Sequence, residues 1–217
     1  MLDPVIGEIL PPAVAVGEAF SDDPAATLFP VEEEAIARAV AKRRREFTTG
    51  RACARVALAR LGLPPAPIPR GERGDPQWPA GVVGSITHCA GYRAGAVAWR
   101  RDVRALGLDA EPHGPLPDGV LNTVASAAEQ TRLAELAATD TGVHWDRLLF
   151  SAKESVYKAW FPLTGQWLGF DGAAIDFDPG SGEFTARILL DDPPVKGFEG
   201  RWRVAGGLLA TAIAVPA

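Results

Sequence analysis

The chain has 217 residues, of which 47% are hydrophobic and 23% are charged, a composition typical of globular proteins and unlike that of disordered or collagen-like chains. This length suits one large domain or two small lobes. A formal net charge of −5 argues against nucleic acid as a partner, because nucleic-acid binding draws much of its affinity from neutralised phosphates.

The sequence also favours a cytoplasmic protein. Its two cysteines cannot form a disulfide framework, and a chain of this length does not need one. Asp3 stands where a secretory signal would carry basic residues, and no apolar run approaches the roughly 18 residues that a membrane span requires. We therefore expect no membrane partner.

In the first half, the patterns predict two helices followed by three strands. Residues 30–45 begin with proline and acids and end with bases, an order that the helix dipole favours, so they are predicted to form one helix. Thr48-Thr49-Gly50 is expected to end it, with a second helix over 51–60. A proline-rich connector over 63–69 follows. Strands are expected at 81–88, 93–99 and 103–111.

The second half repeats this order of helices and then strands. Ser126 and Glu129 have the spacing of a capping box, which predicts a helix start, and residues 144–160 carry the apolar periodicity of a longer helix. Strands are expected at 174–177, 184–190, 202–204 and 208–215. We therefore predict an α+β fold of two similarly built lobes, 1–110 and 111–217, each with a small antiparallel sheet and packed helices.

Two acids in the third predicted strand are candidates for a metal site. Asp109 and Glu111 are two residues apart, so both would project from the same face of the strand. Mg2+ often takes one or two carboxylates and fills its remaining positions with water and phosphate oxygens. The alternative is a solvated strand end, because exposed strands often alternate acids with apolar residues.

A second cluster lies in the helix over 144–160, where Lys153, Glu154, Tyr157 and Lys158 stand within three turns. Glu154 and Lys158 are four residues apart, so they could form an ordinary helix pair worth a few tenths of a kcal/mol. The functional interpretation makes Glu154 a third metal ligand or a general base, with the two lysines neutralising phosphate charge.

Basic residues form a third cluster, and one histidine marks a fourth. Bases over 42–45 suit the last turn of a helix, but Arg51 at a predicted helix start needs a nearby anion. Such a patch suits a phosphate or an anionic protein partner. Thr87 and His88 end a predicted strand, although a lone histidine is more often structural than catalytic.

In this order, the four clusters resemble the Sfp-type 4'-phosphopantetheinyl transferases. The resemblance rests on Arg43 to Arg51, Gly84 to His88, Gly107 to Glu111, and Phe150 to Lys158, and it extends over residues 30–190. Residues 87–93 and 158–164 look more specifically like the actinobacterial, PptT-like branch.

The resemblance implies transfer of the phosphopantetheine arm of coenzyme A to a serine of an apo carrier protein, in fatty-acid, polyketide or peptide synthesis. It also implies a requirement for Mg2+, release of adenosine 3',5'-bisphosphate, a monomer, and coenzyme A bound between two pseudo-symmetric lobes. By matching position, Asp109, Glu111 and Glu154 resemble the metal-binding acids. Glu154 is also the implied base, and Lys153 and Lys158 the implied diphosphate ligands.

Further matches imply the coenzyme A contacts. Arg43, Arg51, Arg70, Arg73 and His88 resemble the residues that hold the nucleotide phosphates, with a hydroxyl from Thr87. Many relatives carry lysine where Arg70 stands, and the two bases differ in geometry. The pantetheine arm would lie along four side chains that could equally be core: Phe150, Tyr157, Trp167 and Leu168.

Two other functions remain open on the sequence. One is a non-catalytic module that binds carrier proteins, against which the retained acids and lysines argue. The other is a different Mg2+-dependent phosphohydrolase or nucleotide transferase. The absence of a Gly-x4-Gly-Lys-Ser/Thr sequence makes use of ATP or GTP less favoured.

Overall fold

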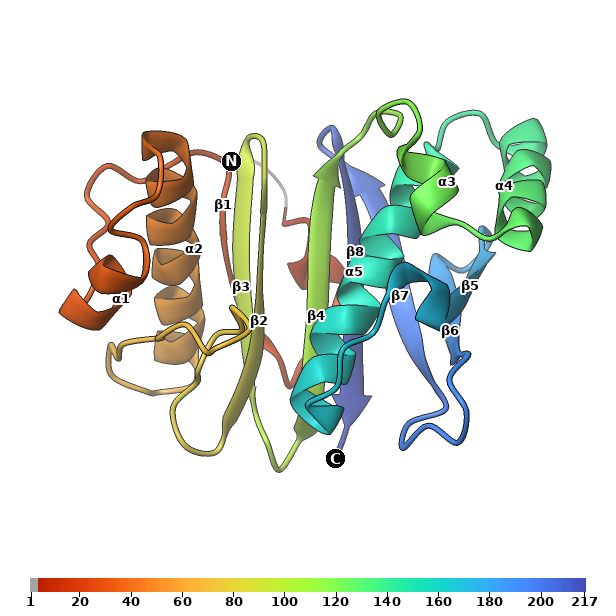
Figure 1. Ribbon diagram of the computed structural model, residues 1–217. Helices are drawn as coiled ribbons and strands as arrows, with labels where there is room; N and C mark the ends of the chain where they lie inside the picture. Colours follow the sequence, from red (N-terminus) through yellow and green to blue (C-terminus); the bar gives the residue numbers. More distant parts are fainter. Residues whose placement is uncertain (1–3) are drawn as a thin grey trace.

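The computed structural model describes residues 4–217 and arranges them in two lobes, seen side by side in Figure 1. The amino-terminal lobe contains a three-stranded antiparallel sheet with the strand order β1-β3-β2. The strands are β1 (Ala15–Ala19), β2 (Val82–Cys89) and β3 (Tyr92–Trp99). The helical segments are η1 (Gly7–Ile9), α1 (Pro30–Ala35) and α2 (Ala41–Arg60).

Two glycines allow α2 to lie directly on this sheet. A Cβ on Gly17 would overlap the carbonyl oxygen of Cys53, and a Cβ on Gly95 would come within 2.7 Å of the backbone of Ala54. The helix face that meets the strands is made of small and apolar residues, so Ala54 and Leu58 are fully buried. Close packing therefore fixes the position of α2 on the sheet. This helix carries the basic residues at 42–45 and Arg51.

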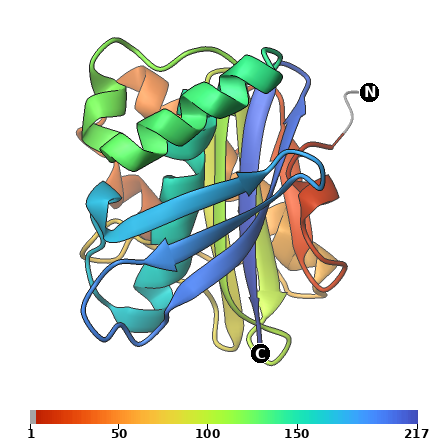
Figure 2. The ribbon, with the colours of Figure 1, turned by 90° about the vertical axis from the view of Figure 1, so that its right-hand side faces the viewer.

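The carboxy-terminal lobe contains a five-stranded antiparallel sheet with the strand order β4-β8-β7-β6-β5. Its strands are β4 (Val103–Pro112), β5 (Ala173–Asp178), β6 (Glu183–Ile188), β7 (Gly197–Ala205) and β8 (Leu208–Pro216). Its helical segments are α3 (Val120–Val124), α4 (Ala127–Thr139), α5 (Trp145–Thr164) and η2 (Phe170–Gly172). Figure 2 shows α4 lying across one end of this sheet.

Helix α5 packs along β4 and β8 and buries its apolar stripe in the core of this lobe (Figure 1). Gly165, with φ of +65°, caps its carboxyl end in the left-handed conformation that glycine adopts most easily. The predicted capping box is confirmed at the start of α4, where the Ser126 side chain accepts a 3.2 Å hydrogen bond from the Glu129 N–H.

The lobes meet where β2 lies beside β4, and side-chain hydroxyls bridge the two strands. The N–H of Leu108 donates to Ser85 Oγ at 3.2 Å, and the N–H of Ala110 donates to Thr87 Oγ1 at 3.0 Å. The backbone of β4 pairs with β8, so the strand belongs to the second sheet. The lobe boundary expected near residue 110 thus falls inside a strand, and sheet pairing places it before Val103.

The prediction of two helices over 30–60 with a break at Thr48-Thr49-Gly50 is wrong. Helix α1 ends at Ala35, and α2 runs without interruption from Ala41 to Arg60. The bases over 42–44 therefore lie in the first turn of a helix, where the dipole disfavours cations, and Arg51 lies in its middle. The dipole explanation for the basic run is therefore lost, and an anionic ligand explains it better.

The α+β fold with two antiparallel sheets and packed helices is confirmed. Two elements, β1 and the short α3, have no counterpart among the predicted ones. Within residues 4–217, no helix combines the length and the apolar character needed to cross a membrane.

Candidate active site

Asp109 lies on β4 at the junction of the lobes, with 5% of its surface exposed. One of its oxygens, Oδ1, accepts a 2.7 Å hydrogen bond from Lys158 Nζ and lies 3.4 Å from Thr87 Oγ1. The other oxygen, Oδ2, is buried without a hydrogen-bond partner among the described residues. A buried carboxylate oxygen of this kind is costly unless a ligand or cation meets it.

Glu111 projects from β4 two residues further on, as the strand spacing predicts, and pairs with Arg147 of α5 at 2.9 Å. Burial raises the pKa of Glu111, and the charge of Asp109 raises it further, against the opposing effect of Arg147. The two carboxylates are therefore close enough to repel each other.

Glu154 approaches these acids from α5 and is half-buried in the cleft. Burial raises its pKa; Lys158 lowers it, and Asp109 raises it. The structure thus brings Glu154 of the helix near Asp109 of the strand, and Lys158 lies close to both. A carboxylate with a raised pKa is a stronger base than an exposed one, which suits a proton acceptor.

The three acids are neighbours rather than an assembled set of metal ligands. Across residues 4–217, no three histidine, cysteine or acidic side chains are grouped closely enough to hold a metal ion alone. The unpartnered Oδ2 of Asp109 and the raised pKa values of Glu111 and Glu154 nevertheless fit a divalent cation. Such a site suits Mg2+, which completes its coordination with water and phosphate oxygens.

Bases of the amino-terminal lobe surround a cavity of about 370 Å³, here called the arginine cavity. Its polar lining comes from five basic side chains and one acid: Arg38, Arg43, Arg51, Arg70, His88 and Glu46. Apolar residues from α1, α2, β2 and the segments between them complete the wall, among them Ile36, Phe47 and Ile86. A cavity that combines several guanidinium groups with apolar walls suits a phosphorylated ligand with a planar or apolar part.

Arg51 is nearly buried, and the environment holds its guanidinium in one place. Its Nε donates to the carbonyl oxygen of Ile68 at 2.9 Å, and its guanidinium carbon lies 4.1 Å from the ring centroid of Phe47. Burial lowers the pKa of Arg51 to about 10; Glu32 raises it, and Arg55, Arg43 and Arg70 lower it. Neighbouring positive charges are costly without a ligand, so a bound anion would relieve them.

His88 ends β2 at the mouth of the same cavity and contacts Arg43 through Nε2. Burial, followed by the charge of Arg43, lowers the pKa of His88 to about 4. The ring is therefore neutral in the free protein at neutral pH. A phosphate bound between His88 and Arg43 would favour protonation of the ring.

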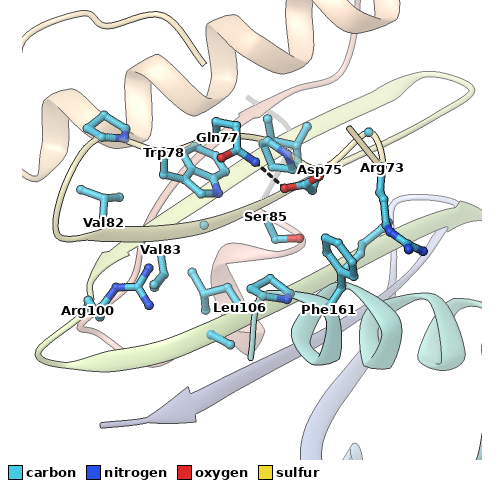
Figure 3. A pocket seen from close by; sticks show the side chains of 18 of the residues that line it. Arg73, Asp75, Gln77, Trp78, Val82, Val83, Ser85, Arg100, Leu106 and Phe161 are labelled. Atoms are coloured by element: carbon cyan, nitrogen blue, oxygen red, sulfur yellow. Dashed lines mark hydrogen bonds between the residues drawn. The ribbon is translucent and has the colours of Figure 1, made fainter. Parts of the chain in front are cut away.

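A second cavity, of about 470 Å³, lies between the lobes and is here called the interlobe cavity. Its walls include Trp78, Ser85, Leu106 and Phe161 (Figure 3). Arg73, three residues after Arg70 in the sequence, also lines it. Glu154, Tyr157 and Lys158 of α5 line it as well. Both cavities share the lining residues Gly74, Pro76 and Ile86, so they are adjacent, and together they are here called the cleft.

Lys153 does not join this cleft, and its expected place at the diphosphate is not supported. It is 4% exposed, and its Nζ donates to Val124 O at 2.8 Å, to Glu129 Oε2 at 2.9 Å and to Phe170 O at 2.7 Å. All three donors of the ammonium group are therefore used inside the carboxy-terminal lobe. One residue along a helix turns the side chain by about 100°, so Lys153 and Glu154 face different surroundings.

The expected contacts for the pantetheine arm are divided between surface and core. Tyr157 lines the interlobe cavity and packs against Trp167, which is 67% exposed; the two rings are tilted by 59°, with centroids 5.0 Å apart. Leu168 is buried in the core of the carboxy-terminal lobe, and Phe150 packs on Phe170. Tyr157 and Trp167 are thus accessible to a ligand, whereas Leu168 is part of the core.

Sequence reasoning missed several residues of this site. Arg147, the partner of Glu111, comes from α5 across the lobe, and no sequence spacing relates the two. Glu46 lies three and four residues after Arg43 and Lys42 and forms long ion pairs with both, so helical spacing could have indicated it. Trp78 lies in an irregular segment, where no periodicity signals a role.

The fold and the site together are those expected of a two-lobed transferase. The acids and Lys158 come from one lobe, and the bases of the arginine cavity come from the other. Two family models match the chain and agree with this division. The model described as the 4'-phosphopantetheinyl transferase N-terminal domain matches residues 31–98, and that of the 4'-phosphopantetheinyl transferase superfamily matches residues 105–207.

Curated relatives match nearly the whole chain. It is 56% identical to 4'-phosphopantetheinyl transferase Svp of Streptomyces mobaraensis, over 98% of this chain and 90% of that protein. It is 52% identical to 4'-phosphopantetheinyl transferase PptT of Mycobacterium tuberculosis, over 96% of this chain and 97% of that protein. It is 48% identical to 4'-phosphopantetheinyl transferase Npt of Nocardia iowensis, over 97% of this chain and 99% of that protein. The chain belongs to the 4'-phosphopantetheinyl transferase superfamily, which confirms the resemblance drawn from its motifs.

Proposed function

We propose that this enzyme transfers the 4'-phosphopantetheine arm of coenzyme A to a serine hydroxyl of an apo carrier protein, with Mg2+ as cofactor and adenosine 3',5'-bisphosphate as second product. One observation carries the proposal. The bases of the arginine cavity come from one lobe and lie next to the interlobe cavity, which Glu154 and Lys158 of the other lobe line. Lys158 in turn donates to Asp109 at 2.7 Å. Such a cleft can hold a nucleotide and a diphosphate at the same time.

The arginine cavity would bind the phosphates of the nucleotide. Arg43 and Arg51 extend from α2, Arg70 comes from the connector, and His88 from β2, so all four approach the ligand from different directions. Guanidinium groups can meet phosphate oxygens with paired hydrogen bonds, which fixes orientation as well as charge. Thr87 Oγ1 already accepts from Ala110 N and holds Asp109, so its role is to position the acid rather than to bind phosphate.

The acids would hold Mg2+ at the diphosphate, Asp109 through its unpartnered oxygen and Glu111 and Glu154 from either side. When bound there, Mg2+ would neutralise charge on the phosphate oxygens. Ala110 between the two strand acids offers no side-chain oxygen, so water and the diphosphate must supply the remaining ligands.

The chemical step needs a proton acceptor and a group that stabilises charge on phosphate. The carrier serine oxygen forms a bond to the phosphorus that carries pantetheine, while the bond from that phosphorus to the bridging oxygen breaks. Glu154 accepts the serine proton, and Lys158 stabilises the charge that develops on the leaving phosphate. General base catalysis of this kind is typically worth about 10²–10⁴-fold in rate.

The pantetheine arm would leave the diphosphate along α5, where Tyr157 and Trp167 offer two rings in contact that a ligand can reach. Aromatic side chains suit this role because they cover apolar surface with little loss of conformational entropy. Leu168 belongs to the buried cluster against which Tyr157 packs, so its role would be to support Tyr157.

Intact-mass measurement tests the proposal. The enzyme is incubated with coenzyme A, Mg2+ and an apo carrier protein, and the carrier should gain the mass of one phosphopantetheine. Glu154→Gln should abolish the gain, whereas Glu135→Gln on the exposed face of α4 should not affect it.

The same experiment separates the other functions. Binding of coenzyme A without any mass gain indicates a non-catalytic module, and cleavage of coenzyme A without a carrier indicates a phosphohydrolase. Transfer at the wild-type rate by Glu154→Gln would refute the assignment of the base.

A further inference from the structure

Three buried hydroxyl groups connect α5 to the sheet beneath it. Ser151 and Ser155 lie one turn apart on α5, and Thr211 lies on β8; all three are fully buried. Thr211 Oγ1 is 2.9 Å from Ser151 Oγ, 2.7 Å from Ser155 Oγ and 3.0 Å from Ser151 O. One hydroxyl thus meets three partners, which matches its one donor and two acceptor positions.

The location of this cluster relates it to the active site. Thr211 stands directly opposite Asp109 in the pairing of β8 with β4, so the two side chains project from the same face of the sheet. Ser155 follows Glu154 in the sequence. The cluster therefore neighbours Asp109 on the sheet and Glu154 along the helix.

Gly107 makes this contact possible. A Cβ at Gly107 would overlap the carbonyl oxygen of Ser155, so only glycine allows the helix backbone to approach β4 this closely. At such a distance, apolar packing alone would tolerate a small slide of the helix along the strand. Hydrogen bonds are directional and do not tolerate it.

We propose that Ser151, Ser155 and Thr211 form a hydroxyl lock that sets the position of α5 along β4 and thereby aligns Glu154 and Lys158 with Asp109. These are positioning residues, because none of them is placed at the reacting atoms. The lock also explains why serines stand beside Lys153 and Glu154 in the motif of α5, which the proposed function leaves unexplained.

The consequence for catalysis follows from the sensitivity of transfer reactions to alignment. A misplacement of about 1 Å in the reacting geometry can reduce the rate by about 10²-fold. Nucleotide binding depends mainly on the amino-terminal lobe, which the lock does not touch. Loss of the lock should therefore lower kcat while leaving the affinity for adenosine 3',5'-bisphosphate unchanged.

The test compares two substitutions at one position. Thr211→Val keeps the shape but removes the hydroxyl, and Thr211→Ser keeps the hydroxyl. We expect Thr211→Val to lower kcat at least about tenfold, with the dissociation constant of adenosine 3',5'-bisphosphate within twofold of wild type, and Thr211→Ser to recover most of the rate. Ser155→Ala, a smaller change, gives a folded variant if Thr211→Val fails to fold.

A control separates alignment from loss of stability. Ile188→Val removes one buried methyl group from β6 and should lower the melting temperature without lowering kcat. An equal fall of kcat in this control, or wild-type kcat in Thr211→Val or Ser155→Ala, would overturn the lock.

The inference rests on the proposed function, so a readout without activity is added. In a crystal structure of Thr211→Val, the distance from Lys158 Nζ to Asp109 Oδ1 should exceed the 2.7 Å of the wild-type protein. An unchanged distance contradicts the lock. Absence of transfer by the wild-type enzyme would instead contradict the proposed function and leave this structural test to decide on the lock.

Discussion

Replacement of Lys153 by methionine distinguishes a structural lysine from a phosphate ligand. The ammonium group donates to Glu129 Oε2, Val124 O and Phe170 O, and it is 4% exposed. Lys153→Met leaves the buried Glu129 carboxylate and two carbonyl groups without this partner. Breaking a buried ion pair in this way costs about 3–5 kcal/mol of unfolding free energy.

This loss is large enough to measure by two methods. For a chain of this length, each kcal/mol lowers the melting temperature by about 2–4 °C, so a decrease of about 6–20 °C is expected. Urea unfolding followed by tryptophan fluorescence gives the free energy, and thermal unfolding gives the temperature. Lys196→Met, at an exposed lysine, is the matched control. It should change the unfolding free energy by no more than about 0.5 kcal/mol and leave the melting temperature nearly unchanged.

A double-mutant cycle isolates the ion pair. Glu129→Gln removes the charge that Lys153→Met leaves unpaired, so the double variant should lose less stability than the sum of the two single variants. If Lys153→Met were as stable as the Lys196→Met control, and transfer were lost, the lysine would act at the diphosphate and the structural assignment would be refuted.

Three further predictions concern the cleft and the helix above it. Arg51→Ala should raise the dissociation constant of coenzyme A by about 10–150-fold, because loss of a hydrogen bond to a charged group costs about 1.5–3 kcal/mol. Slow turnover should remain at saturating coenzyme A. Wild-type affinity in a calorimetric titration would contradict the phosphate site. The folded protein holds the pKa of His88 at about 4, below the ordinary histidine value of 6.5. The neutral ring therefore contributes stability above pH 6.5, and this contribution is lost as the pH falls towards 4. His88→Gln should therefore flatten the pH dependence of urea unfolding in that window, and an unchanged slope would show that the ring is not held neutral. Gly107→Ala should destabilise the protein and slow transfer, because its Cβ would overlap the backbone of α5, whereas Gly114→Ala, with open space around its Cα, should do neither; equal melting temperatures of the two variants would argue against the close approach.

The strand acids and the helix motif could be predicted because their signals are local. Asp109 and Glu111 follow a two-residue spacing, which fixes a common face wherever the strand lies. Glu154 and Lys158 are one turn apart, which fixes a common helix face. The structure places all four side chains in one region, as these spacings and the resemblance together suggested.

The course of α2 could not be predicted, because tertiary contacts override weak local preferences. Thr48 donates to Arg44 O, Thr49 accepts from Asp23 N, and Gly50 lies against Ile86 of β2. These contacts keep residues with low helix propensity inside a continuous helix. Because the helix boundary was predicted wrongly, the basic run was expected at the end of a helix, whereas it lies at the start of α2.

The buried carboxylate of Glu32 was missed for a related reason. It accepts from Phe29 N at 2.9 Å, from Ile68 N at 2.8 Å and from Arg55 Nη1 at 3.0 Å, and so joins α1, α2 and the connector that leads to Arg70. In the sequence it is one of three consecutive glutamates, which look like an ordinary solvated helix start. Only the assembled fold distinguishes the buried one.

Calorimetric titration of coenzyme A into wild-type enzyme, Arg51→Ala and Lys158→Met, in the presence of Mg2+, tests most directly whether both lobes hold one ligand. We predict one binding site per chain and a weaker affinity in each variant. Arg51 lines the arginine cavity of one lobe, whereas Lys158 lies beside Asp109 in the other lobe. Wild-type affinity in either variant would show that coenzyme A contacts one lobe only and would contradict the account.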